Sequence, residues 1–212
     1  MKYNNTYYPI NEEIINIWTH FIGFILAIVA LVLLTLKAWE QENSLRLICF
    51  VVFGVSMVIL YLASTLYHNS KTAKLRYRLN ILDHAAIYVL IAGTYTPFNL
   101  LILKGTIGWV FFGVTWGIAI MGVFYKFFFI GKQDKISTIL YVLMGWIIVF
   151  AIKPLYENFS ALGLFWLALG GVLYTVGALF YSRKNMKYNH AIFHVFVLLG
   201  SFSHFISIYY YV

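Results

Sequence analysis

The sequence predicts an all-α integral membrane protein built as a bundle of seven transmembrane helices. Of its 212 residues, 62% are hydrophobic and only 10% are charged, which is too apolar for an ordinary soluble domain. Apolar runs of about 20 residues, long enough to cross about 30 Å of hydrocarbon, recur along the chain. Because the segments between these runs are short, we expect residues 1–212 to form a single seven-helix domain.

The apolar runs define seven spans that follow one another along the sequence. The expected spans are Ile14–Ala38, Leu47–Tyr67, Ile81–Leu103, Ile107–Phe129, Ile136–Leu155, Leu162–Tyr181 and Ala191–Val212. Pro97 lies inside the third span, where a missing backbone N–H should kink the helix and open a cavity below it. Small residues in the sixth span predict close helix packing, and they are Gly163, Gly170, Gly171 and Gly177.

The distribution of positive charge predicts how the bundle is oriented in the membrane. Seven crossings place the termini on opposite sides, and eleven of the fifteen Lys and Arg residues fall on the side of the N-terminus. They are Lys2, Lys71, Lys74, Arg76, Arg78, Lys126, Lys132, Lys135, Arg183, Lys184 and Lys187. The positive-inside rule therefore predicts a cytoplasmic N-terminus and an external C-terminus. Topology alone explains the net charge of +8, so we expect no nucleic-acid partner.

Four ionisable residues within or beside the apolar runs should lie at a similar depth, near the cytoplasmic face. His68 ends the second span, Asp83 begins the third, and His190 and His194 open the seventh. The last two form the pattern HAIFH, whose i,i+4 spacing projects both imidazoles from one side of a helix. Ionisable groups inside a membrane are costly and usually face a cavity or a partner. The four residues therefore form a candidate functional site.

The chemistry of this residue set favours a zinc ion. Three neutral imidazoles, from His68, His190 and His194, with a water molecule in the fourth position form the usual open arrangement of a catalytic zinc. Asp83 could be a fourth ligand or could hold that water by a hydrogen bond, and we favour the second role because it leaves a position open for chemistry. Ser64 precedes His68 by one helical turn, so its hydroxyl could bind a ligand or a developing oxyanion.

The same histidines could instead be packing or proton-handling groups, which is a common role for a single intramembrane histidine. Three other histidines are expected to be structural. His20 could support the site from outside the ligand set or simply line the bundle. His84 projects about 100° away from Asp83 on a helix, and His204 lies about 15 Å from His194 along the helix axis, too far to share its metal.

Several segments together resemble the bacterial hemolysin III family, within a wider group that includes the progestin and adiponectin receptors and, more distantly, the alkaline ceramidases. The segments are NEEIINIWTHFIG, YLASTLYH, LDHAAIYVLIAGTYTPF, GGVLYTVGALFY and HAIFHVFVLLGSFSHF, and the resemblance covers almost the whole chain. It implies seven helices with a cytoplasmic N-terminus in a bacterial cell membrane. It also implies a zinc ion surrounded by Ser64, His68, Asp83, His190 and His194, none of which is substituted here.

Three functions are compatible with this resemblance. The first is a zinc-dependent intramembrane hydrolase that cleaves a lipid amide or ester, as the similarity to ceramidases implies, with membrane lipids as partners and substrate. The second is a cytolytic or pore-forming protein, as the family name implies. The third is a non-catalytic regulator of membrane lipid composition whose zinc is structural.

Overall fold

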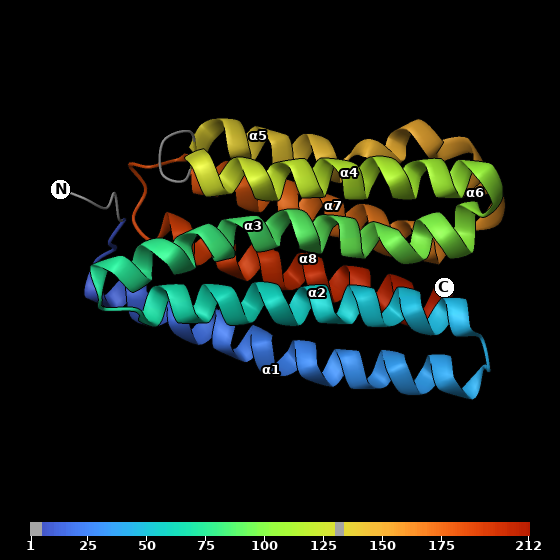
Figure 1. Ribbon diagram of the computed structural model, residues 1–212, viewed down its shortest axis with the longest axis horizontal. Coiled ribbons are helices and arrows are strands. Elements are labelled where there is room, and N and C mark those ends of the chain that lie inside the picture. Colours follow the sequence, from blue (N-terminus) through green and yellow to red (C-terminus); the bar gives the residue numbers. More distant parts are fainter. Residues whose placement is uncertain (1–5, 130–133) are drawn as a thin grey trace.

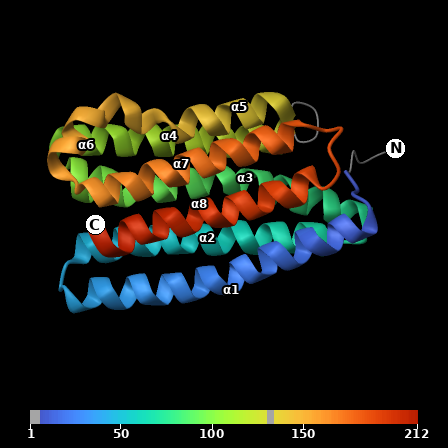
Figure 2. The ribbon, with the colours of Figure 1, turned by 180° about the vertical axis from the view of Figure 1, so that it is seen from behind.

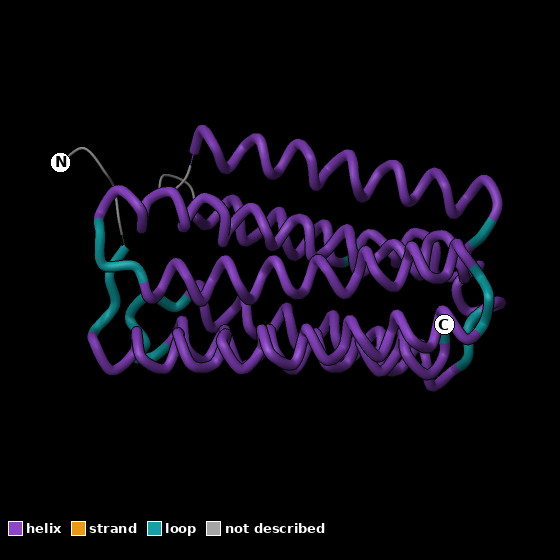
Figure 3. Tube along the Cα trace, turned by 60° about the horizontal axis from the view of Figure 1, so that its bottom comes forward, coloured by secondary structure: helices purple, strands orange, loops and turns teal. Residues whose placement is uncertain are grey.

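The computed structural model describes residues 6–129 and 134–212, which are helical with no strand among them (Figure 3). The connections between helices lie mostly at the two ends of the bundle. The elements are α1 (Ile10–Glu40), α2 (Ser44–Asn69), α3 (Ala73–Pro97), η1 (Phe98–Leu103), α4 (Gly105–Phe129), α5 (Asp134–Gly145), η2 (Ile147–Ala151), α6 (Ile152–Asn158), α7 (Ala161–Ser182) and α8 (Asn189–Tyr211). Of these, η1 is a π-helix and η2 is a 3-10 helix.

Seven helical stretches within the described residues are long and apolar enough to cross a membrane, which confirms the predicted fold class. The third stretch combines α3 with η1, and the fifth combines most of α5 with η2 and α6. Figure 1 shows that α1 begins at one end of the bundle and α8 ends at the other, as an odd number of crossings requires. Which end faces the cytoplasm stays a prediction, and two of its basic residues, Lys2 and Lys132, lie outside the described residues.

The third span begins earlier than the apolar run suggested. Helix α3 starts at Ala73, so Arg76 belongs to its first turn and not to a loop, and its side chain is buried. Asp83 therefore does not begin the helix but lies ten residues after its start. The start of this helix was predicted too late, because the basic residues of the segment lower its hydropathy although they are part of the helix. At Pro97, where the sequence predicted a kink, α3 ends and the π-helix η1 follows it directly.

The fifth span is interrupted, whereas the sequence predicted a continuous helix. Helix α5 ends at Gly145, and η2 begins at Ile147. Tyr95 of α3 bridges the interruption, because its hydroxyl donates to the Gly145 carbonyl (2.6 Å) and accepts from the Ile148 N–H (3.2 Å). Backbone groups released inside a membrane need such partners, since no bulk water can replace them.

Two views show the same arrangement of helices: α1 and α2 lie at one edge of the bundle, α4 and α5 lie at the other, and α3, α7 and α8 lie between them (Figures 1 and 2). The predicted close packing of the sixth span is seen at three of its four glycines. A Cβ at Gly163, Gly170 or Gly177 would overlap Phe159, His204 or Phe196 respectively, whereas one at Gly171 would lie 3.6 Å from Trp146. The contacts at Gly170 and Gly177 pack α8, with its histidines, against α7.

Candidate metal centre

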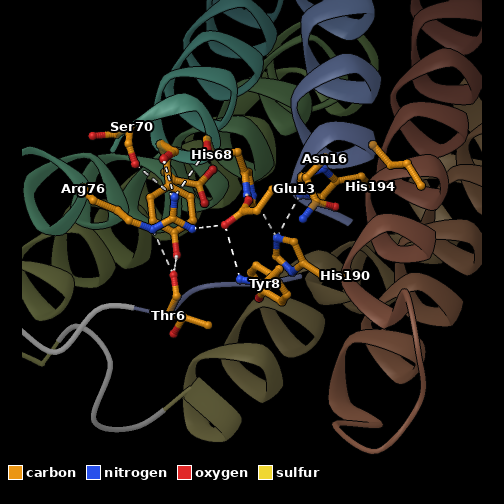
Figure 4. Close-up of polar contacts among 12 residues, drawn as sticks. Thr6, Tyr8, Glu13, Asn16, His68, Ser70, Arg76, His190 and His194 are labelled. Carbon is orange, nitrogen blue, oxygen red and sulfur yellow. Dashed lines mark hydrogen bonds and ion pairs between the residues drawn. The ribbon is translucent and has the colours of Figure 1, made fainter. Parts of the chain in front are cut away.

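Two helix ends place the histidines of the candidate site. His68 lies in the last turn of α2, and His190 and His194 lie in the first two turns of α8 (Figure 4). The start of α8 is fixed against α7, because the Asn189 side-chain amide donates to the carbonyl of Tyr181 (3.0 Å). All three imidazoles are buried, with exposed fractions of 3%, 4% and 1%.

The three imidazoles converge on one point through their Nε2 atoms. His190 Nε2 lies 3.1 Å from His68 Nε2 and 3.0 Å from His194 Nε2. All three ligand atoms lie within 4.8 Å of one another. Nitrogen ligands of a tetrahedral zinc with bonds of about 2.0–2.1 Å lie about 3.3–3.4 Å apart. The residues therefore fit a metal ion, and this convergence is the geometry that the sequence predicted for His68, His190 and His194.

Hydrogen bonds at the opposite ring nitrogens determine where the lone pairs point. His68 Nδ1 lies 2.7 Å from Oε2 of Glu13, which as a carboxylate can only accept, so the ring hydrogen is on Nδ1. His194 Nδ1 lies 3.4 Å from the Thr19 hydroxyl, which already donates to the carbonyl of Ile15 (2.8 Å) and is left to accept. Both rings therefore direct an Nε2 lone pair at His190.

This convergence cannot be satisfied by ordinary hydrogen bonds alone. A neutral imidazole nitrogen in the ring plane offers one hydrogen or one lone pair, so His190 Nε2 cannot make a good hydrogen bond to both neighbours. Buried polar atoms without partners are rare and costly. A cation shared by three lone pairs satisfies the three Nε2 atoms. Metal-ligating histidines usually donate their other N–H to an acceptor, as His68 and His194 do here, whereas Nδ1 of His190 has no partner among the described residues.

Two aromatic rings cover the histidines. The ring of His20 stacks on His194, with centroids 3.5 Å apart and planes 10° from parallel, so His20 contacts the site from outside the ligand set. Tyr8, in the segment before α1, stacks on His190 at 4.6 Å. Burial raises the pKa of the Tyr8 phenol, so this ring is uncharged at neutral pH. Together they shield the imidazoles from solvent.

Asp83 and Ser64, the two residues predicted to act beside the metal, lie on the wall of the same cavity as His190 and His194. Asp83 is buried and lies outside the group of three imidazoles that could hold a metal among the described residues, so whether it is a ligand or holds water stays a prediction. The Ser64 hydroxyl is buried and has no hydrogen-bond partner among the described residues. The structure thus places both side chains on the wall of a cavity that His190 and His194 also line, and their roles in chemistry stay predictions.

The cavity extends from the histidines far along the bundle. It encloses about 290 Å³, and its wall comes from every spanning segment except α4. Away from the histidines it is lined largely by apolar side chains, among them Leu90, Phe98, Leu155 and Leu164. Several polar groups along it are paired within the chain: Trp146 Nε1 donates to Thr175 Oγ1 (2.9 Å) and His204 Nε2 to the Leu167 carbonyl (3.1 Å). A largely apolar space thus ends at a polar centre.

The family of the chain follows from comparison with known proteins. The model of a family described as "Haemolysin-III related" matches residues 8–205. The chain belongs to this family. It is 47% identical over 203 residues to "Hemolysin-3" of Bacillus cereus, covering 96% of this chain and 93% of that protein. It is 46% identical to the "Hemolysin-3 homolog" of Bacillus subtilis (strain 168), over 96% of each.

A more distant relative also aligns with nearly the whole chain. "Monocyte to macrophage differentiation factor" of Homo sapiens is 26% identical over 99% of this chain and 87% of its own length. These matches confirm the predicted resemblance and, with the seven apolar helices, show a multi-pass membrane protein of the haemolysin-III-related family.

Sequence reasoning missed the groups of this haemolysin-III-related chain that lie behind the imidazoles. Glu13 is hydrogen-bonded to His68 and forms an ion pair with Arg76 (Figure 4). Thr19 is hydrogen-bonded to His194. One signal was available: Glu13 is an acidic residue at the start of an apolar helix, within the segment NEEIINIWTH. Its partner could not be read from the sequence, because His68 is 55 residues away.

Of the remaining histidines, His84 and His204 lie outside the converging group, as expected. His84 Nδ1 lies 3.0 Å from the carbonyl oxygen of Asn80, and His204 Nε2 lies 3.1 Å from that of Leu167. Backbone carbonyls only accept, so these nitrogens carry the hydrogen; the acceptor for His84 lies one turn earlier in the same helix, and the acceptor for His204 lies on α7.

Proposed function

We propose that this protein is a zinc-dependent hydrolase of lipid amides or esters in the plasma membrane of a bacterial cell, with its metal centre near the cytoplasmic face. The observation that carries the proposal is the convergence of His68 Nε2 and His194 Nε2 on His190 Nε2, at 3.1 and 3.0 Å, with the lone pairs of the first two directed inward by their Nδ1 partners. The apolar cavity beside this centre supports a lipid as the substrate, because a long hydrocarbon chain fits its lining.

The residues divide the work of hydrolysis as follows. His68, His190 and His194 would hold the ion. When bound, zinc supplies a Lewis acid that polarises a carbonyl and makes water more acidic. The Asp83 carboxylate takes a proton from the attacking water and returns it to the leaving nitrogen or oxygen, while a C–O bond forms and the C–N or C–O bond breaks. The Ser64 hydroxyl, which has no partner among the described residues, donates to the substrate carbonyl oxygen.

The first test measures metal content in the detergent-purified protein by elemental mass spectrometry. We expect about one zinc per chain, lost in His190→Ala/His194→Ala and retained in His204→Ala, which removes a histidine from the same helix outside the centre. Turnover of lipid amides and esters in mixed micelles should follow the zinc. A wild-type chain without metal would refute the metal site, and a zinc-free variant that still hydrolyses lipid would refute the mechanism.

A second candidate follows from the relatives, two of which are named for hemolysin. In that case the purified chain would release ions from liposomes, and zinc removal would not change the flux. The cavity favours hydrolysis over this alternative, because its largely apolar lining suits a lipid chain better than a hydrated ion. A non-catalytic regulator would bind zinc through the same histidines and turn over no lipid.

A further inference from the structure

Glu13, in the first turns of α1, contacts three separate parts of the chain through one carboxylate. Oε2 accepts from His68 Nδ1 of α2 (2.7 Å). Oε1 accepts from the Arg76 guanidinium of α3 and, more weakly, from the backbone N–H of Tyr8 (3.3 Å). The Glu13 side chain is only 16% exposed. It therefore joins a metal-centre histidine to two neighbouring segments of the chain (Figure 4).

Arg76 holds this carboxylate in a fixed place. Its side chain is 2% exposed and is bound on every side. Nη1 donates to the carbonyls that end α2, those of Tyr67, His68 and Ser70, at 3.2–3.3 Å. Nε donates to the carbonyl of Thr6 (3.0 Å), and the guanidinium lies 4.6 Å from the ring centres of Tyr7 and Tyr67. A guanidinium held by this many contacts fixes the position of the Glu13 carboxylate relative to the end of α2.

We propose that Glu13 is the positioning residue of the metal centre. Its carboxylate keeps the hydrogen of His68 on Nδ1, so the Nε2 lone pair faces the other two imidazoles, and it orients the ring along that direction. The negative charge also makes the imidazole a stronger donor, as carboxylates behind metal-bound histidines do elsewhere. Arg76 acts through Glu13 and not on the metal. This inference rests on the metal site of the proposed function, and it adds a residue that touches neither ion nor substrate.

A purely structural role for Glu13 makes a different prediction. If the carboxylate served only as the partner of Arg76, its loss would lower the stability of the metal-free and metal-loaded protein equally, and the affinity for metal would not change. A positioning role predicts a weaker affinity and an altered coordination of the bound ion. The two roles are separated by metal affinity and by the visible spectrum of bound Co²⁺, which reports ligand geometry.

The experiment compares four full-length proteins in detergent: wild type, Glu13→Gln, Glu13→Asp and the control Glu40→Gln. Glu40 is an exposed glutamate at the far end of the same helix. Zinc affinity is measured by competition with a chromogenic chelator, and Co²⁺ spectra are recorded for each protein. We expect affinity to fall about 10–100-fold in Glu13→Gln and less in Glu13→Asp, which keeps the charge. Glu40→Gln should match wild type.

Each outcome decides the inference. Wild-type affinity and an unchanged Co²⁺ spectrum in Glu13→Gln would overturn it and leave the proposed hydrolase intact. Weakened binding in this variant with no lipid turnover by the wild type would support the inference and refute the hydrolase. A wild-type chain that binds no zinc would overturn both. If Glu13→Gln does not fold, the test is Glu13→Asp, whose shorter side chain moves the carboxylate away from His68. An unchanged zinc affinity in Glu13→Asp would overturn the inference.

Discussion

The metal centre and the interruption of the fifth span both place polar groups inside the membrane-spanning part of the chain, but they are satisfied in opposite ways. At the interruption, the Tyr95 hydroxyl bonds both Gly145 and Ile148, and the Trp146 indole bonds Thr175. At the centre, hydrogen bonds are made at Nδ1 of His68 and His194, and the Nε2 lone pairs are left facing one another. In the first region these polar groups find their hydrogen-bond partners within the chain, whereas in the second the lone pairs that face one another can bind a ligand.

The comparison teaches how to separate structural from functional polar groups in a membrane protein. Burial does not separate them, because Tyr95 and the three imidazoles are all at most 5% exposed. The number of hydrogen-bond donors relative to acceptors does separate structural from functional polar groups. A region where each donor meets an acceptor can be explained by folding alone, whereas a region where lone pairs outnumber the donors that face them can bind a cation. Variants in the two regions should therefore have different consequences.

The largest effect is expected from Arg76, which supports the metal centre from behind. Arg76→Leu removes the cation that Glu13 faces and the donors to the end of α2. Loss of one partner from a buried ion pair costs about 3–5 kcal/mol. We expect the free energy of unfolding in detergent to fall by about this amount, together with zinc affinity. Arg78→Leu, at an exposed position two residues further along α3, is the control, and equal effects of both variants would contradict the role of Arg76.

A substitution at the interruption of the fifth span should lower the free energy of unfolding but leave zinc affinity unchanged. Tyr95→Phe removes the hydroxyl that satisfies the Gly145 carbonyl and the Ile148 N–H. Leaving buried groups unpaired costs about 1–3 kcal/mol. Denaturation in detergent should show this loss, while zinc affinity stays at the wild-type value. Tyr156→Phe, at an exposed tyrosine, should change neither. A drop in zinc affinity in Tyr95→Phe would show that the two regions are coupled.

A neighbouring pair of glycines tests the packing that holds α8 in place. A Cβ at Gly170 overlaps the His204 ring, so in Gly170→Ala this ring, or α8 with it, must shift, and we expect a cost of about 1–3 kcal/mol. Gly171→Ala meets Trp146 at an ordinary 3.6 Å and gains helix propensity, so it should be neutral or slightly stabilising. Thermal unfolding of the two variants measures the difference. Equal thermal stability of the two variants would show that the contact between Gly170 and the His204 ring can relax without strain.

The fold could be predicted because hydrophobic length is a local property of the sequence. The seven spans and the pairing of His190 with His194 follow from residues that are close in the chain. The start of α3 could not be read in this way, because its first turns carry three positive charges, one of which, Arg76, is buried against other segments. The interruption of the fifth span was invisible for a similar reason: the partner that permits it, Tyr95, lies 50 residues from Gly145.

The candidate site shows the same limit. Three imidazoles could be grouped by depth and spacing, since ligand chemistry restricts which residues can serve. The groups behind them could not, because a carboxylate, a hydroxyl or a backbone carbonyl can each orient an imidazole, and only the packing of α1 against α2 and α8 selects Glu13 for His68 and Thr19 for His194. What the sequence could not supply is therefore the pairing between helices and not the residue types.

The smallest effect should come from substitution of Thr19. It allows the contributions of Thr19 and Glu13 to zinc affinity to be compared. Thr19→Val removes a neutral acceptor that lies 3.4 Å from His194 Nδ1, whereas Glu13 is a charged acceptor at 2.7 Å from His68 Nδ1. A neutral hydrogen bond contributes about 0.5–1.5 kcal/mol, which corresponds to roughly 2–10-fold in zinc affinity. Thr35→Val, in the same helix and remote from the centre, is the control, since its hydroxyl donates only to the Leu31 carbonyl. If Thr19→Val weakened zinc binding more than Glu13→Gln, the hydroxyl and not the carboxylate would be the stronger support, and the contrast between charged and neutral partners would have to be reversed.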